Sequence, residues 1–124
     1  MKNIVVITLE ELKIHGEELC DFIIKNNIEY YLLSYNNGKF LTWVWCLTHG
    51  IPPIKIYSKF FKQSRNDFYK KCVNKIMKEF DKNTTMIRFI ISDKQYLNSI
   101  CGYNISIMTF DEYKKFYKIY TKPK

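Results

Sequence analysis

The chain alternates short apolar runs with longer segments in which apolar residues recur every three or four positions. Short runs of this kind predict strands, and the longer spacing predicts helices. We expect strands at Lys2–Ile7, Ile28–Tyr35, Lys39–Thr48, Ile54–Tyr57, Met86–Ile91 and Ile105–Met108. We expect helices at about Leu9–Asn26, from Ser58 or Ser64 to Asp81, at Asp93–Cys101 and at Phe110–Tyr120. Gly16 weakens the first helix and leaves open a break at His15-Gly16.

Three apolar runs end at a hydroxyl residue that is followed three positions later by an acid or an amide. The three pairs are Thr8 and Glu11, Ser92 and Gln95, and Thr109 and Glu112. In this capping box the hydroxyl accepts a hydrogen bond from an N–H of the first helical turn, and the acid or amide side chain reaches back to the amide of the cap. Three strands that lead directly into capped helices predict an α/β fold.

Asn37-Gly38 is the preferred pair for a two-residue hairpin turn, and it predicts that the strands on either side pair antiparallel. Both faces of this hairpin are apolar, which is typical of strands covered on both sides. We therefore expect a single α/β domain over residues 1–120, with a mixed central sheet, a tight hairpin and helices on both faces. Residues 121–124 are expected to form a flexible basic tail.

Composition suggests a cytoplasmic protein of a reducing compartment. The 124 residues include no apolar stretch near the roughly 18 needed to cross a bilayer. The four cysteines are far apart in sequence and fall within apolar patterns, so we expect buried thiols. The net charge of +8 comes from 18 lysines and only two arginines, and alanine is absent, as an AT-rich genome would impose. Such a genome fits a phage, a large DNA virus or a low-GC bacterium.

The predicted order of a helix, a three-stranded meander, a helix and a strand over about Leu9–Ser92 is similar to the core order of restriction-endonuclease-like nucleases. Those enzymes hold a metal with an Asp on the second meander strand and a Glu-x-Lys on the third. Here the corresponding stretches are residues 41–45 and 53–55, and of the family's metal-site residues only the lysine has a counterpart, which is Lys55. The resemblance therefore implies an inactive relative that keeps a surface for nucleic acid.

Few residues have the spacing of a reactive site. His15 and His49 each precede a glycine and could together form an acid–base pair for phosphodiester chemistry, although histidines at element ends more often cap or face solvent. Asp93 and Asp111 follow strands, where they could bind a divalent cation, but helix capping also explains them. The glycines are isolated and form no phosphate loop. We expect no catalytic residues, metal or cofactor.

Surface chemistry is the stronger signal. Lysines recur along one face of the predicted helix that ends at Asp81, and tyrosines line one face of the last helix. The proposed contact residues are Lys71, Lys75, Lys78, Lys82, Tyr113, Tyr117 and Tyr120. The lysines could equally form a solvated face enriched by codon bias. The tyrosines suit a partner groove or a homodimer contact.

Together these features predict a non-catalytic binding protein, of the kind a phage or virus uses to inhibit a nucleic-acid-processing or host-defence complex. Its partner would be a protein or nucleoprotein, and no membrane is involved. Two alternatives stay open: direct binding of nucleic acid through the lysine row, and a small histidine-dependent phosphodiesterase.

Overall fold

The computed structural model describes residues 2–36, 38–58, 64–80, 85–91 and 105–121, which form a single α/β domain. Five parallel strands and five helices lie in this part of the chain. The strands are β1 (Lys2–Thr8), β2 (Tyr30–Ser34), β3 (Lys55–Ser58), β4 (Thr85–Ile90) and β5 (Ile105–Met108). The helices are α1 (Leu9–His15), α2 (Glu17–Lys25), α3 (Lys39–Thr48), α4 (Arg65–Lys78) and α6 (Phe110–Thr121).

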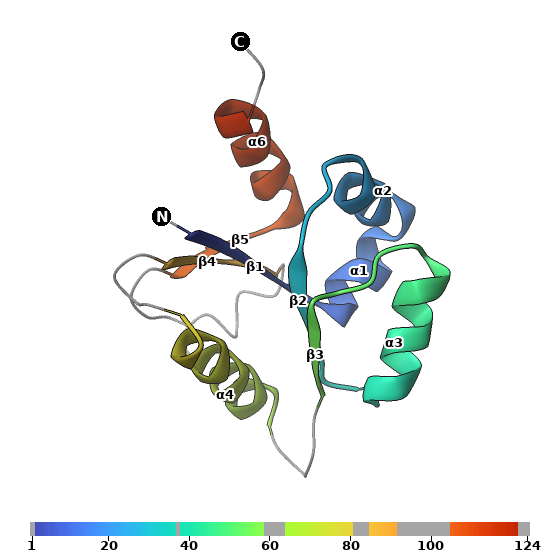
Figure 1. Ribbon diagram of the computed structural model, residues 1–124, viewed down its shortest axis with the longest axis vertical. Coiled ribbons are helices and arrows are strands. Elements are labelled where there is room, and N and C mark those ends of the chain that lie inside the picture. The colour runs from blue at the N-terminus through green and yellow to red at the C-terminus, as the bar shows by residue number, and fades with distance from the viewer. Residues whose placement is uncertain (1, 37, 59–63, 81–84, 92–104, 122–124) are drawn as a thin grey trace.

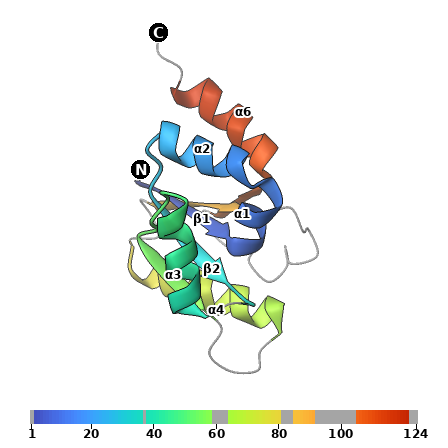
Figure 2. The same cartoon turned by 90° about the vertical axis from the view of Figure 1, so that its right-hand side faces the viewer.

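The strands are ordered β3-β2-β1-β4-β5, and every pair is parallel. The helix α4 covers one face of the sheet, and α1, α2, α3 and α6 cover the other (Figures 1 and 2). Each face has its own apolar core. Val5, Ile7 and Leu32 point into one core, and Val6 and Leu33 point into the other. The predicted α/β class, with helices on both faces, is confirmed.

The predicted hairpin is wrong, because residues 39–48 form the helix α3 and not a strand. The helix connects two strands that lie side by side in parallel, and such strands need a crossover connection. The sheet is therefore parallel and not mixed. A run that is apolar on all sides has no clear period, and its length of ten residues suits a helix better than a strand.

Without the hairpin the meander also disappears, and with it the likeness to restriction-endonuclease-like nucleases. That likeness depended on antiparallel neighbours over residues 28–57, where the structure has β2, α3 and β3 in a parallel crossover. Lys55 begins the edge strand β3, after the rigid segment at Pro52 and Pro53. The edge position predicted for this strand is confirmed.

The helix ends follow the sequence closely. Thr8 caps α1 by accepting a hydrogen bond from the Glu11 amide at 3.3 Å. Thr109 and Glu112 form a complete capping box, with both hydrogen bonds at 3.2 Å. Gly16 separates α1 from α2 with a φ of 55°, which settles the open question of a break there.

Some predictions lie outside the described residues. These are the capping pair Ser92 and Gln95, the helix at 93–101, and positions 122–124 of the expected tail. Thr121, which was assigned to the tail, is the last residue of α6.

Candidate binding surfaces

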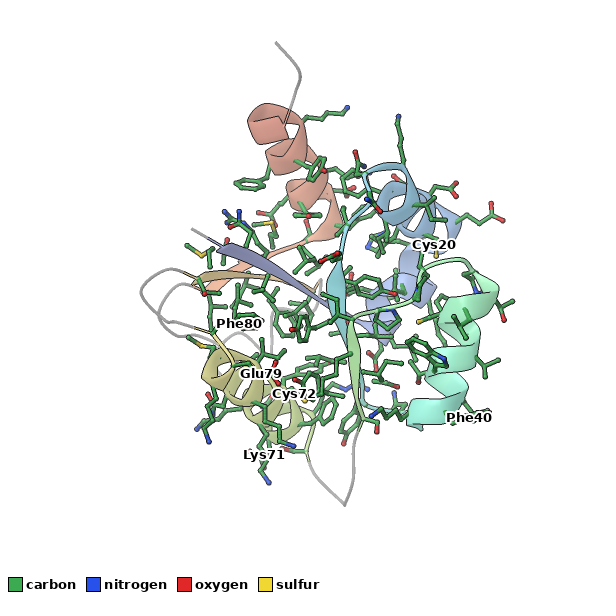
Figure 3. The ribbon with its side chains drawn as sticks, in the orientation of Figure 1. Cys20, Phe40, Lys71, Cys72, Glu79 and Phe80 are labelled. Carbon is green, nitrogen blue, oxygen red and sulfur yellow. The ribbon has the colours of Figure 1, made fainter. Side chains whose placement is uncertain are left out.

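A row of lysines runs along the solvent side of α4. Lys71, Lys75 and Lys78 are exposed and are spaced so that they share one side of the helix. Lys71 points away from the sheet in Figure 3. The opposite side of α4 is buried in the core through Phe68, Tyr69, Cys72, Val73 and Ile76. The helix contains five basic residues and one acidic residue. Lys82, the fourth lysine of the predicted row, lies outside the described residues.

The helix α3 has the reverse arrangement, with its large apolar side chains turned towards solvent. Phe40 is 76% exposed, Leu41 67% and Leu47 50%, and Trp43 and Val44 are also exposed. Phe40 lies at the outer end of the helix in Figure 3. Monomeric proteins seldom leave an apolar patch of this kind uncovered. We call Phe40, Leu41, Trp43, Val44 and Leu47 the α3 apolar face.

The inner side of α3 is anchored by small and polar groups. The Thr42 and Ser34 hydroxyls are 2.9 Å apart, and Thr42 Oγ1 also donates to the Gly38 carbonyl at 2.9 Å. The Tyr30 hydroxyl lies 3.7 Å from Cys46 Sγ and donates to the Ile51 carbonyl. Buried polar groups that are paired in this way help to fix the helix in place, together with Trp45, which is half-buried against the core.

Two grooves adjoin the α3 apolar face and share Ile54. The first has a volume of about 450 Å³ and is lined by Lys39, Phe40, Trp43, Ile54, Lys55 and Ile56. The second, of about 600 Å³, runs from Ile54 across the loop before β3 to the end of α2. The apolar surface therefore extends beyond α3 itself.

The tyrosines of α6 are less accessible than the sequence suggested. Tyr113 is 5% exposed and lies against Phe22 with ring centroids 5.8 Å apart. Tyr117 is half-buried against the same ring and donates a hydrogen bond to the Asn26 carbonyl at 3.4 Å. Burial raises the pKa of Tyr113 to about 12. These two side chains hold α6 against α2, which leaves little of their surface for a partner. The Tyr120 side chain lies outside the described residues.

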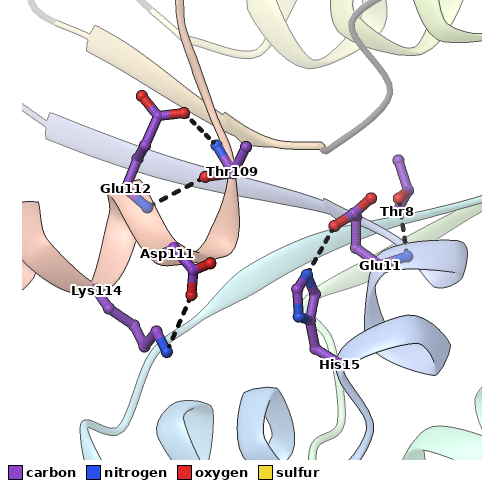
Figure 4. A network of polar contacts seen from close by, with 7 residues as sticks. All are labelled: Thr8, Glu11, His15, Thr109, Asp111, Glu112 and Lys114. Atoms are coloured by element: carbon purple, nitrogen blue, oxygen red, sulfur yellow. Dashed lines mark hydrogen bonds and ion pairs between the residues drawn. The ribbon is translucent and has the colours of Figure 1, made fainter.

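The two histidines have separate local partners. His15 Nε2 lies 3.2 Å from the carboxylate of Glu11, which is buried (Figure 4). The His15 and Phe110 rings also meet edge to face, with centroids 5.0 Å apart. His49 stacks on Trp45 with ring centroids 4.0 Å apart, and its Nδ1 lies 2.8 Å from the Trp45 carbonyl. The described contacts of His15 are with α1 and α6, and those of His49 are with α3.

Asp111 is accounted for by helix and ion-pair contacts. It lies in the first turn of α6, and its carboxylate is 3.2 Å from Lys114 (Figure 4). Lys114 also pairs with Glu18 of α2. Asp93, the other candidate ligand, lies outside the described residues. Within residues 2–36, 38–58, 64–80, 85–91 and 105–121, no three His, Cys, Asp or Glu side chains are grouped closely enough to hold a metal ion.

All four cysteines were predicted to be buried thiols, and the prediction is confirmed for the three that the structure describes. Cys20, Cys46 and Cys72 are free and buried. Burial raises the pKa of each thiol, that of Cys72 to about 12. A thiol with a raised pKa is a poor nucleophile at neutral pH. Cys101 lies outside the described residues.

The main surface that sequence reasoning missed is the α3 apolar face, because the prediction of a strand assigned three of its residues to one side of a sheet and two to the other. The sequence signal for a helix here is the length of the run, ten residues of which only Lys39 is charged. The parallel pairing of β2 with β3, which requires a crossover helix, cannot be seen in the sequence.

No family model matches the chain, and a search of the curated proteins found no match. No helix in the described part of the chain is both long enough and apolar enough to span a membrane. The arguments about function therefore depend on the surfaces described above.

Proposed function

We propose that the protein is a non-catalytic binding protein, an inhibitor of phage or virus type that occupies a nucleic-acid-processing or host-defence complex. The observation that carries the proposal is the row of Lys71, Lys75 and Lys78, all exposed on a helix with five basic residues and one acidic residue. Such a row attracts surfaces rich in carboxylates or phosphates, and the nucleic acid that such a complex holds is a dense row of phosphates.

The roles of the candidate reactive groups support action by contact. Glu11 and Phe110 surround His15, Trp45 packs against His49, and Lys114 pairs with Asp111. Each group thus has a structural explanation. The buried thiols of Cys20, Cys46 and Cys72 suit a reducing compartment, which would be the host cytoplasm for a viral protein.

A charge-reversal experiment tests the proposal. The triple variant Lys71→Glu, Lys75→Glu, Lys78→Glu is compared with the wild type for capture of a complex from host extract and for inhibition of that complex in a purified assay. We expect the triple variant to lose both. The matched control reverses three exposed lysines on the other side of the sheet, Lys13, Lys25 and Lys115, and should keep both.

Two outcomes would count against the proposal. Equal loss in both triple variants would show that net charge matters and the position of the α4 lysines does not. Capture without inhibition would show that the protein binds but does not block.

Direct binding of nucleic acid through the same lysines is the second candidate. The observation that favours it is the regular spacing of three exposed lysines along one helix, which suits contact with successive phosphates without reading bases. Filter binding to DNA and RNA at several salt concentrations tests it. Each phosphate contact adds roughly 0.9 to the slope of log affinity against log salt, so the triple variant should flatten that slope. A salt-independent affinity would exclude this candidate.

A further inference from the structure

The α3 apolar face is the largest feature that the proposed function does not use. The helix α3 lies on the face of the sheet opposite to α4 in Figures 1 and 2, and the side chains of its apolar face are exposed. Its five side chains, together with Ile54, present on the order of 600 Å² of apolar surface to solvent. A standard interface buries about 800 Å² on each partner, so this patch could supply most of one.

The spacing of the α3 apolar face is self-complementary. Phe40, Val44 and Leu47 follow the i, i+4, i+7 pattern, with Trp43 beside them, so they form one seam along the helix. If a second α3 lies antiparallel across a two-fold axis near Val44, Phe40 meets Leu47 of the partner subunit, and Leu47 meets Phe40 of the partner subunit. A two-fold contact of this kind uses one patch on both chains.

Charge favours the antiparallel arrangement over the parallel one. Lys39 is the only charged residue of α3, and it lies at the amino end of the helix. In the antiparallel pair this ammonium lies near the carboxyl end of the other α3, where the last carbonyl groups attract a cation. In a parallel pair the two Lys39 side chains would lie together and repel each other.

The net charge of +8 opposes self-association in general, but the position of the lysines limits this effect at α3. The α4 row lies on the other face of the sheet, so it does not enter the contact (Figure 1). The groove beside Phe40 and Trp43 is also lined by Lys39 and Lys55, and Lys55 lies 3.4 Å from the carboxylate of Glu79. The seam of Phe40, Val44 and Leu47 has no charged side chain of its own.

We propose that the protein forms a two-fold homodimer through antiparallel α3 helices, with the α3 apolar face as the core of the interface. The groove lined by Phe40, Trp43 and Ile54 receives Leu47 of the partner subunit. The dimer presents two α4 lysine rows on its outer sides.

Sedimentation of the whole chain over a wide range of concentrations tests the association. The wild type should change from a species of 15.0 kDa to one of twice that mass. Val44→Asp puts an unpaired charge into the seam and should raise the dissociation constant at least about tenfold. Asn74→Asp adds the same charge at an exposed position of α4, so it is the matched control and should leave the dissociation constant unchanged. Circular dichroism checks that each variant is folded. A monomer at every concentration, or a dimer that Val44→Asp does not weaken, overturns the proposal.

Cysteine crosslinking tests the orientation. The experiment uses a Cys101→Ser background. The other three cysteines, Cys20, Cys46 and Cys72, are kept because their thiols are buried. Val44→Cys places a thiol close to its own copy at the two-fold axis and should form a covalent dimer under mild oxidation. Thr48→Cys is exposed at the end of α3 and should not form one, because antiparallel helices separate the two copies of this residue. Crosslinking of Thr48→Cys as well as Val44→Cys would show a parallel pair, and binding of α3 only to a different protein would show that its occupant is not a second copy. Either result overturns the proposal.

Discussion

The helices α3 and α4 pack on opposite faces of one sheet and divide their residues in opposite ways. In α4 the large apolar side chains are buried and the lysines face solvent. In α3 the buried residues are Thr42 and Cys46, Trp45 is half-buried against the core, and the residues of the α3 apolar face are exposed. All the large apolar side chains of the α4 core face are therefore covered within the chain, while α3 has an exposed apolar face suited to a further contact. The difference indicates that α4 owes its place to apolar burial, and α3 owes its place to a few paired polar groups and one half-buried tryptophan.

The largest expected contrast is between two phenylalanines. Phe68 of α4 is 2% exposed, and Phe40 of α3 is 76% exposed. Phe68→Ala should lower the free energy of unfolding by about 3–5 kcal/mol, because it leaves a cavity in the core. Phe40→Ala should change it by less than about 0.5 kcal/mol. Urea unfolding at low protein concentration measures both, and Phe68→Leu gives a milder variant if Phe68→Ala does not fold. Equal costs would contradict the contrast between the two helices.

The polar anchor of α3 should show the next largest effect. Thr42→Val keeps the shape of the side chain but leaves Ser34 and the Gly38 carbonyl without the Thr42 hydroxyl. We expect a loss of about 1–3 kcal/mol in the free energy of unfolding. Thr48→Val is the matched control, because the exposed Thr48 hydroxyl bonds only to the Val44 carbonyl of its own helix, and its cost should be near zero. A double-mutant cycle with Ser34→Ala then measures the coupling. A coupling of zero would show that this hydrogen bond does not anchor α3.

The thiol beneath α4 should make stability depend on pH. Burial raises the pKa of Cys72 from 9.0 to about 12, although Lys75 acts in the opposite direction. The folded chain therefore keeps a proton that the unfolded chain releases above about pH 9, so this stabilisation is present below that pH and is lost as the pH rises towards 12. From about pH 8 to about pH 10.5, the free energy of unfolding should fall further in the wild type than in Cys72→Ala. The difference between the two proteins should grow by about 1 kcal/mol for each pH unit above 9. Urea unfolding at both pH values measures this. Parallel pH curves for the two proteins would contradict it.

The smallest expected effects come from the helix caps. Ser64 caps α4 by accepting a hydrogen bond from the Asp67 amide at 3.2 Å, whereas Gly38 at the start of α3 provides no side-chain cap. Ser64→Ala should cost about 1 kcal/mol. Gly38→Ser should stabilise the fold by about 0.5 kcal/mol, because its backbone is extended and an added Cβ meets nothing within 4 Å. Thermal unfolding of both variants checks these signs, and a destabilising Gly38→Ser would show that α3 needs glycine at its start.

The sequence correctly predicted those elements whose local residue pattern is compatible with only one kind of structure. The helix α4, the caps at Thr8 and Thr109 and the edge strand after Pro53 each follow from a local rule. The helix α3 could not be recovered from local rules, because Asn37-Gly38 favours a hairpin and the following residues have high strand propensity. Its helical form depends on the parallel pairing of β2 with β3, which is a tertiary fact.

The candidate surfaces also divide into those that local sequence patterns predict and those that depend on contacts between distant residues. The exposure of Lys71, Lys75 and Lys78 could be predicted, because a helix that buries one face must expose the other. The burial of Tyr113 depends on Phe22, which is far from it in sequence, and no local pattern predicts that contact. The α3 apolar face was missed because its residues were assigned to a strand.

The position of β1 affects how the chain folds during synthesis. Of the five described strands this one is synthesised first, yet it lies at the centre of the sheet, where Lys2 pairs with Thr85 and Ile4 with Ile87. Its pairing with β4 must wait until residues 85–90 have been translated. Until α4 and β4 emerge, the side of β1 and β2 that carries Val6 and Leu33 is exposed. The nascent chain therefore has a long aggregation-prone interval, and slow folding that benefits from chaperones is expected.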